Sequence, residues 1–162
     1  MPENPLIVEL DGPIWLKLRM TVPPLDAQDL LRWFTDPVRL ARWMGDEHVV
    51  DLVPGGRYTI RWEKADRTME GAVIVARPTE LVFSWAFAHE PDAPARVVMV
   101  QTATADDGSG STIVIVHGPY RSETEDEATG DAEAQERSGH LEGWQWFLAE
   151  LRNQLAASPA LT

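Results

Sequence analysis

Cysteine is absent from the 162 residues, which excludes disulfides, thiolate metal sites and cysteine nucleophiles. Basic residues are also few: lysine and arginine together number 14 against 26 acidic residues, for a net charge of −12. Because so acidic a surface repels phosphate groups, we expect neither nucleic acid nor an anionic membrane as a partner. The composition, with 44% hydrophobic and 25% charged residues, is nonetheless that of a globular protein.

Long hydrophobic runs and targeting signals are missing as well. No stretch approaches the roughly 18 apolar residues that a membrane helix needs. The first eleven residues contain no basic residue, whereas a secretory signal begins with a basic segment. These features predict a cytoplasmic protein.

The sequence also lacks the common catalytic and metal-binding motifs. It contains no GxSxG and no HExxH segment, and its four histidines are not closely spaced. We therefore expect no metal and no cofactor, and we assign no catalytic residue.

Tryptophan, by contrast, is abundant, with seven residues. Alternating apolar residues predict strands joined by short loops, which is typical of an antiparallel meander. Asp26 and Asp36-Pro37 predict the starts of two short helices after the first strand. The last segment has apolar residues at helical spacing. The expected strands are 14–22, 48–52, 57–63, 67–76, 80–87, 95–105 and 111–118, and the expected long helix is 131–157.

The central strands predict a specific register. A tight turn at 64–67 places Trp62 opposite Met69 and Arg61 opposite Glu70, as a cross-strand charge pair. A slip of one residue would turn the arginines into the core, so the pattern constrains the pairing strongly.

In the next hairpin we expect Val75 opposite Leu81 and Gly71 beside Trp85, where the glycine leaves room for the ring. One face of the sheet is then strongly apolar and aromatic. The expected members of this face are Tyr58, Ile60, Trp62, Met69, Gly71, Val73, Val75, Leu81, Phe83, Trp85 and Phe87.

The C-terminal helix is expected to cover this apolar face, so the predicted architecture is α+β. Gly143, inside the helix, is interpreted as a point of close approach to the sheet. We predict a single domain over 1–162, with tails at 1–12 and 158–162. The segment 119–134 is expected to be an acidic loop leading into the helix, and the run 122–136, which contains seven acids, is expected to be solvated. A lid or a docking patch for a basic partner is the alternative interpretation of that run.

Several short motifs follow this order of elements. They are Phe34-Thr35-Asp36-Pro37, Leu40-Ala41-Arg42-Trp43-Met44-Gly45, Pro54-Gly55-Gly56-Arg57-Tyr58, Leu81-Val82-Phe83-Ser84-Trp85, Val116-His117-Gly118 and Gly143-Trp144. Together they resemble proteins of the activator of Hsp90 ATPase homologue-like family. The resemblance covers roughly 14–155 and implies the START-like (SRPBCC) helix-grip fold, a curved antiparallel sheet wrapped around a long C-terminal helix. It also implies one of three functions that occur in the superfamily: binding of hydrophobic ligands, catalysis by cyclases or dehydratases, and co-chaperone activity.

The aromatic face and the resemblance together favour a non-catalytic protein that binds a small hydrophobic or amphipathic molecule between sheet and helix. His140 and Trp144 share a helix face because they are four residues apart. The candidate ligand-binding residues are Tyr58, Ile60, Trp62, Met69, Val73, Phe83, Trp85, His117, His140 and Trp144. Plain core packing is the alternative interpretation of each aromatic residue in this set.

Two other functions stay open. One is a protein-interaction module of the co-chaperone kind. The other is a cyclase- or dehydratase-type enzyme in which His140 or His117 transfers protons and Tyr58 assists. A homodimer is also left open, through Trp146 or an edge strand.

Overall fold

The computed structural model describes residues 6–9, 14–121 and 126–157. These residues form eight strands and three helices. The strands are β1 (Leu6–Glu9), β2 (Leu16–Val22), β3 (Glu47–Val50), β4 (Arg57–Trp62), β5 (Arg67–Arg77), β6 (Glu80–Trp85), β7 (Arg96–Thr104) and β8 (Ser111–Gly118). The helices are α1 (Ala27–Thr35), α2 (Pro37–Leu40) and α3 (Glu127–Ala157).

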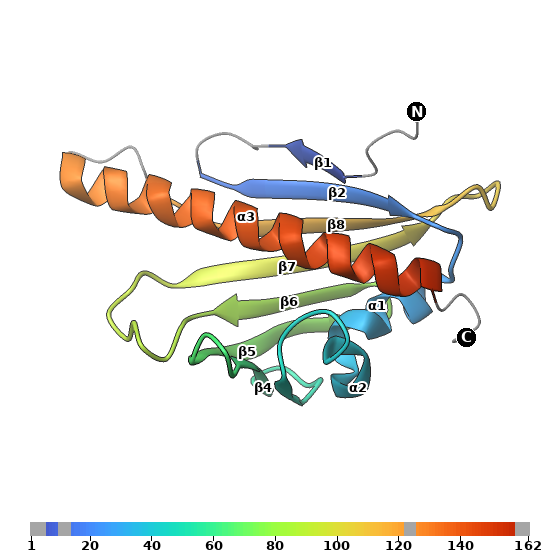
Figure 1. Ribbon diagram of the computed structural model, residues 1–162, viewed down its shortest axis with the longest axis horizontal. Coiled ribbons are helices and arrows are strands. Elements are labelled where there is room, and N and C mark those ends of the chain that lie inside the picture. Colours follow the sequence, from blue (N-terminus) through green and yellow to red (C-terminus); the bar gives the residue numbers. More distant parts are fainter. Residues whose placement is uncertain (1–5, 10–13, 122–125, 158–162) are drawn as a thin grey trace.

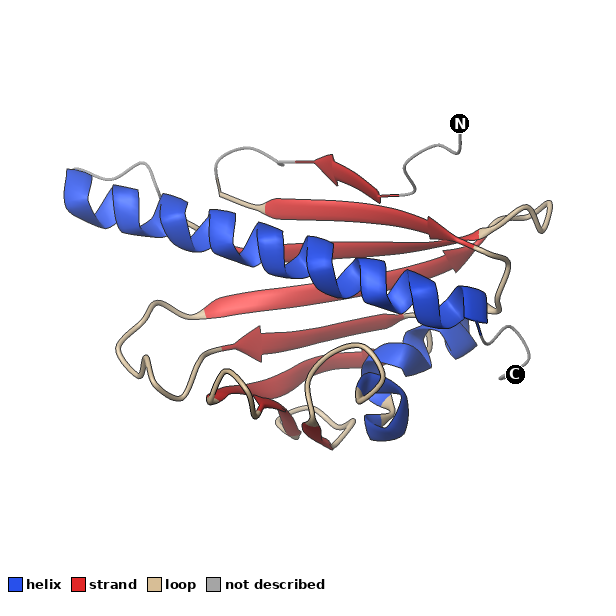
Figure 2. Cartoon of the chain, in the orientation of Figure 1, coloured by secondary structure: helices blue, strands red, loops and turns tan. Residues whose placement is uncertain are grey.

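The strands make one antiparallel sheet in the order β1-β2-β8-β7-β6-β5-β4-β3. Helix α3 lies across one face of this sheet, and α1 and α2 sit near its lower right end (Figure 1). The two short helices connect β2 to β3, and every later connection up to β8 is a loop (Figure 2). The predicted helix-grip fold is therefore confirmed.

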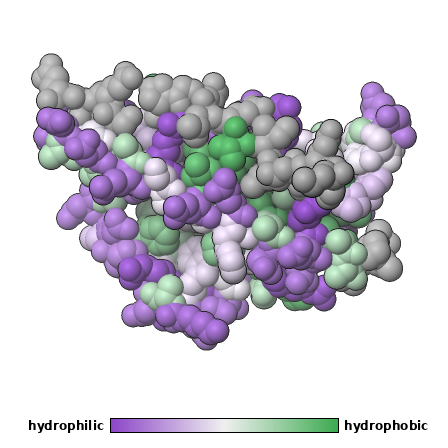
Figure 3. Space-filling model, turned by 45° about the horizontal axis from the view of Figure 1, so that its top comes forward, coloured by the Kyte–Doolittle hydropathy of each residue, from purple (hydrophilic) through white to green (hydrophobic). Residues whose placement is uncertain are grey.

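The core lies between α3 and the inner face of the sheet. Along β2, Leu16, Leu18, Met20 and Val22 are buried, while the residues between them are more exposed, as a half-buried strand requires. The C-terminal half of α3 packs Leu148, Leu151 and Leu155 onto this face. The surface seen in Figure 3 is mostly hydrophilic, with hydrophobic side chains gathered in small areas.

The two short helices begin at the predicted capping residues. The Asp26 side chain accepts a hydrogen bond from the Gln28 amide at 2.8 Å, and Asp36 accepts one from Val38 at 3.0 Å. After α2 the chain turns at Gly45, where φ is +85°, a conformation that glycine adopts without strain. This turn leaves the buried Met44 beside β4.

The register between β4 and β5 differs from the prediction by two residues. Trp62 pairs with Arg67, and Ile60 pairs with Met69, because the turn at 63–66 is longer than expected. The predicted charge pair between Arg61 and Glu70 is therefore wrong. Arg61 instead contacts Asp66 at 3.0 Å. A shift of two keeps each side chain on its predicted face, since the side-chain period of a strand is two.

The hairpin between β5 and β6 contains a bulge. Val73 pairs with Phe83 as expected, but Val75 pairs with Val82 instead of Leu81. The extra residue, Ile74, turns Val75 away from the predicted apolar face.

Gly71 allows a close approach of backbone, not of an aromatic ring. A Cβ atom at this position would lie 2.1 Å from the carbonyl oxygen of Ser84 and 3.0 Å from that of Tyr58. The expected role of this glycine, to make room for Trp85, is corrected accordingly.

The two ends of the chain also differ from the prediction. The expected tail at 1–12 contains β1, which pairs with β2. Helix α3 begins at Glu127, so much of the expected acidic loop is helical. The expected tail at 158–162 lies outside the described residues.

Replacing Gly71 with alanine tests the close approach between β5 and β6. We expect Gly71→Ala to lower the free energy of unfolding by about 2 kcal/mol or more, because its Cβ meets backbone atoms that cannot rotate away. Urea denaturation measures the change. Gly139→Ala, in α3, is the matched control: its Cβ meets no atom within 4 Å, and we expect a gain of about 0.5–1 kcal/mol. Equal stabilities for the two variants would contradict this account.

Candidate functional site

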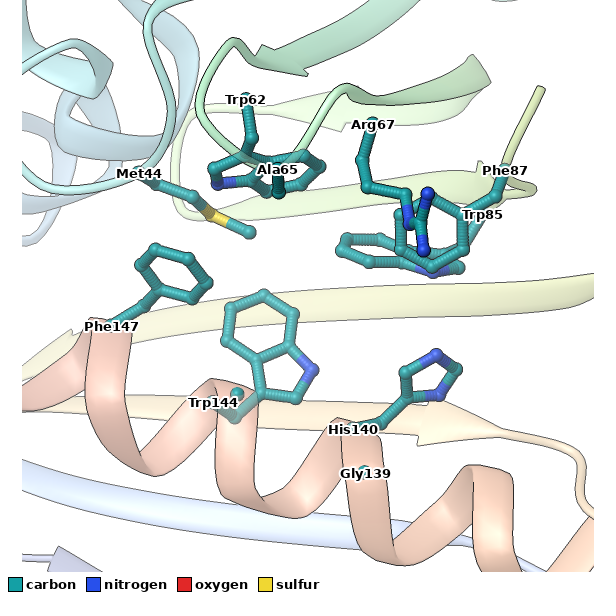
Figure 4. A pocket seen from close by; sticks show the side chains of 11 residues that line it. Met44, Trp62, Ala65, Arg67, Trp85, Phe87, Gly139, His140, Trp144 and Phe147 are labelled. Atoms are coloured by element: carbon teal, nitrogen blue, oxygen red, sulfur yellow. The ribbon is translucent and has the colours of Figure 1, made fainter. Parts of the chain in front are cut away.

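A cavity of about 260 Å³ lies between α3 and the sheet, at the side of β4, β5 and β6. Its wall is almost entirely apolar. Side chains from the sheet and from α3 point toward one another across it (Figure 4). The lining residues are Met44, Trp62, Ala65, Arg67, Trp85, Phe87, Gly139, His140, Gly143, Trp144 and Phe147.

Aromatic rings make up most of the cavity wall. Trp62 from β4 and Trp85 from β6 have ring centroids 6.4 Å apart. On the helix side, Phe147 lies 5.9 Å from Trp62, and Trp144 lies 6.0 Å from Trp85. The rings are tilted toward one another, which is a favourable arrangement for aromatic pairs. The result is a concave aromatic surface shared by the sheet and α3.

Two glycines on α3 leave the helix side of the cavity open. Gly139 and Gly143 both line the cavity, and a Cβ atom at either position would meet no atom within 4 Å. Gly143 was expected to allow close approach of helix and sheet. That interpretation is wrong, because the space beside Gly143 is free.

Four of the predicted ligand-binding residues line the cavity: Trp62, Trp85, His140 and Trp144. The other six do not. They are buried beside or behind it, within the core, and consist of Tyr58, Ile60, Met69, Val73, Phe83 and His117. Alternation along a strand identifies which side chains point inward, but it does not show which of them the helix covers.

The hydroxyl of Tyr58 is used inside the core. It donates a hydrogen bond to the carbonyl oxygen of Phe34 at 2.5 Å, and its ring stacks on Phe83 at 4.0 Å. Full burial raises the pKa of Tyr58 far above its ordinary value. The suggested role of Tyr58 as a catalytic helper is therefore wrong, because its hydroxyl does not reach the cavity.

His117, on β8, is held in one neutral tautomer. The indole nitrogen of Trp144 donates a hydrogen bond to Nδ1 of His117 at 2.9 Å. Because an indole nitrogen can only donate, Nδ1 must be the unprotonated nitrogen of that imidazole. Burial, and then the nearby His140 and Arg96, hold the pKa of His117 well below its ordinary value.

His140 connects the cavity to a polar cluster behind it. Its ring stacks on that of His117 with centroids 4.5 Å apart, and its Nδ1 lies 2.6 Å from the hydroxyl of Tyr120. Burial, followed by the positive charge of Arg96, lowers the pKa of His140 to about 4. The imidazole at the cavity wall is therefore neutral at pH 7.

A buried ion pair fixes the N-terminal half of α3. Arg96, 3% exposed, contacts both carboxylate oxygens of Glu133, which is 6% exposed. Its Nε donates to Glu136 at 2.7 Å, and its guanidinium lies over the ring of Tyr120 at 4.7 Å. The acidic segment was expected to be solvated. That expectation is wrong for Glu133 and Glu136, because both pair with Arg96, which lies about 40 residues earlier in the chain.

Within residues 6–9, 14–121 and 126–157, no group of three or more histidine or acidic side chains is placed to hold a metal ion. None of the described helices is both long enough and apolar enough to cross a membrane.

A comparison with protein families decides the affiliation of the chain. The model of the family described as activator of Hsp90 ATPase homolog 1-like protein matches residues 25–156. The chain belongs to this family. The predicted resemblance is thereby confirmed.

Solved structures agree with this assignment at the level of the fold. A protein from Rhodobacter sphaeroides superposes with a TM-score of 0.73 at 20% identity, covering 95% of this chain and 99% of the other. An HSP90 activator from Plasmodium falciparum has a TM-score of 0.61 at 21% identity, with 88% and 96% covered. DynU16, from the dynemicin biosynthetic locus, has a TM-score of 0.67 at 18% identity, with 96% and 48% covered. No curated protein sequence matches the chain significantly.

The low pKa of His140 makes the stability of this family member depend on pH. The folded-state pKa, about 4, lies below the unfolded value of 6.5, so the neutral form stabilises the fold. This stability is complete above about pH 6.5 and is lost as the pH falls toward 4. Between pH 7 and pH 5 we expect wild type to lose about 2 kcal/mol more than His140→Gln, by urea denaturation at each pH. Parallel losses in the two proteins would show that His140 titrates normally.

Removal of Arg96 tests the buried ion pair. We expect Arg96→Met to lower the free energy of unfolding by about 3–5 kcal/mol, because it leaves the buried Glu133 carboxylate without a partner. Adding Glu133→Gln to this variant should restore part of the lost free energy of unfolding. Arg77→Met is the control, since Arg77 is 70% exposed in its pair with Glu80, and we expect it to lose less than about 1 kcal/mol. Thermal denaturation compares the variants, and a small loss in Arg96→Met would contradict the account.

Proposed function

We propose that this protein binds a small apolar or amphipathic molecule in the cavity between α3 and the sheet, without catalysing its conversion. The observation that carries the proposal is the aromatic wall around unfilled space. The rings of Trp62, Trp85, Trp144 and Phe147 face a volume that no side chain of the described residues occupies. A concave apolar cavity with a few polar groups is the usual form of a small-molecule site.

The dimensions and chemistry of the cavity limit the ligand. A cavity of about 150 Å³ is enough to hold benzene, so about 260 Å³ suits a molecule of one or two rings. Tilted and stacked contacts with the indoles favour a flat, aromatic ligand. His140 adds one neutral imidazole, which can exchange a hydrogen bond with a polar substituent.

The glycines of α3 that line the cavity give independent support for a ligand site. A glycine within a helix costs about 1 kcal/mol relative to alanine. At Gly139 and Gly143 the structure has room for a methyl group, so packing gives no reason for glycine there. Both positions line the cavity, and a larger side chain at either would reduce the space available to a ligand.

The enzyme alternative has less support. Of the three residues suggested for it, Tyr58 is bonded to Phe34, and His117 is fully buried with its Nδ1 bonded to Trp144. His140 alone reaches the cavity, and its low pKa leaves it neutral, with little basicity at pH 7. The co-chaperone alternative draws on the family description and on the Plasmodium falciparum relative.

Filling the cavity from α3 tests the proposal. We expect the neutral two-ring fluorophore 1-aminonaphthalene to bind wild type with enhanced emission, and Gly143→Leu to weaken binding about tenfold or more, because the leucine occupies the ligand space. Ala149→Leu is the matched control: Ala149 is exposed on the same helix and does not line the cavity. Fluorescence titration gives the dissociation constants.

The outcomes separate the proposed function from its alternatives. Binding that is lost in Gly143→Leu and kept in Ala149→Leu supports a ligand site in this cavity. Native mass spectrometry of gently purified protein would add the mass of any ligand carried from the cell. Absence of binding by wild type, together with no copurified molecule, would overturn the proposal and favour the interaction module.

A further inference from the structure

We infer that the ligand is an aromatic carboxylate, with its ring among the tryptophans and its carboxylate at Arg67. The inference rests on the proposed function, because it names the ligand class of the same cavity. Among the described residues that line the cavity, Arg67 is the one cationic side chain and none is acidic.

The position of Arg67 follows from the sheet. It is the first residue of β5 and pairs with Trp62 of β4. Residues directly opposite in a pair share a face, and Met69, two residues on, is completely buried on that same inner face. Arg67 therefore projects from the inner face of the sheet, on the side of the cavity, as Figure 4 shows. At the end of its strand it remains exposed, so it lies where the cavity meets solvent.

No described residue supplies Arg67 with a counter-charge. Other arginines near the sheet have one: Arg61 contacts Asp66, Arg77 contacts Glu80, and Arg96 contacts Glu133. For Arg67, the described part of the chain provides neither an ion pair within 4.0 Å nor a hydrogen bond from the side chain. A guanidinium presents its donors as a planar fork, which matches the two oxygens of a carboxylate.

Two further polar groups of the described wall, both indole nitrogens, are also donors without acceptors. The indole nitrogens of Trp62 and Trp85 are buried, and neither has a hydrogen-bond partner among the described residues. A carboxylate only accepts hydrogen bonds, so it complements such a wall better than an amine, which mainly donates.

A cationic ligand is the strongest competitor. Aromatic faces attract cations, and the net charge of −12 favours them at long range. At about 0.15 M ionic strength, however, charges more than about 8 Å apart are largely screened, so the charge nearest the ligand has the greatest effect. In the cavity wall that charge belongs to Arg67.

Three ligands of equal shape test the charge preference. They are naphthalene-2-carboxylate, the neutral naphthalene-2-carboxamide and the cationic 2-naphthylmethylammonium, titrated by isothermal calorimetry at pH 7. We expect wild type to bind the carboxylate about fivefold or more tightly than the amide, and the cation more weakly than both. Arg67→Gln should abolish the preference for the carboxylate over the amide. Arg67→Lys should keep part of the preference, because it retains the charge but not the fork.

Arg57→Gln is the matched control. It makes the same change in net charge, but Arg57 is exposed on β4, one residue before the inward-facing Tyr58, and does not line the cavity. We expect it to retain the carboxylate preference within about twofold. Circular dichroism and thermal denaturation confirm that each variant is folded.

Each outcome has a distinct meaning. Equal binding of carboxylate and amide, or a preference that survives in Arg67→Gln, overturns the inference and leaves the proposed function intact. Tighter binding of the cation also overturns it, in favour of an aromatic site for amines. If none of the three binds and 1-aminonaphthalene does not bind either, both the inference and the proposed function fail.

Discussion

The hydrogen bond between Trp144 and His117 is the contact on which the site depends. It joins α3 to β8 inside the core, where a missing partner would be costly for either group. It also sets the neutral tautomer of His117, on whose ring His140 stacks. The same bond orients the indole of Trp144, which forms part of the aromatic wall. This one contact thus joins the helix to the sheet, sets the tautomer of His117, and orients one indole of the cavity wall.

The two halves of α3 are attached to the sheet by different forces. Toward the C-terminus, Leu148 and Leu151 are buried on the inner face of the sheet, where the contact is apolar. Toward the N-terminus, the attachment is the buried pair of Arg96 and Glu133 beside Tyr120. The cavity lies between these two attachments. Trp144 contacts His117 within this stretch, and Gly139 and Gly143 leave the space beside it open.

The fold was predictable because its signals are local. Alternation identified the strands, aspartates marked both short helices, and the order of motifs indicated the family. The cavity was predictable only in part. Trp62 and Phe83 both point inward in the pattern, yet only Trp62 faces the cavity, because the path of α3 across the sheet decides which inner residues it covers. The pair of Arg96 and Glu133 was missed because no periodicity links residues 37 positions apart.

Gly139 and Gly143 also determine how easily mutation could reduce this cavity during evolution. Every glycine codon is a single base away from an alanine codon. At both positions such a step would strengthen the helix and meet no obstacle in the surrounding structure. The mutational path toward a smaller cavity is thus short and leads to a more stable protein. Folding stability alone gives the chain no reason to keep this space open.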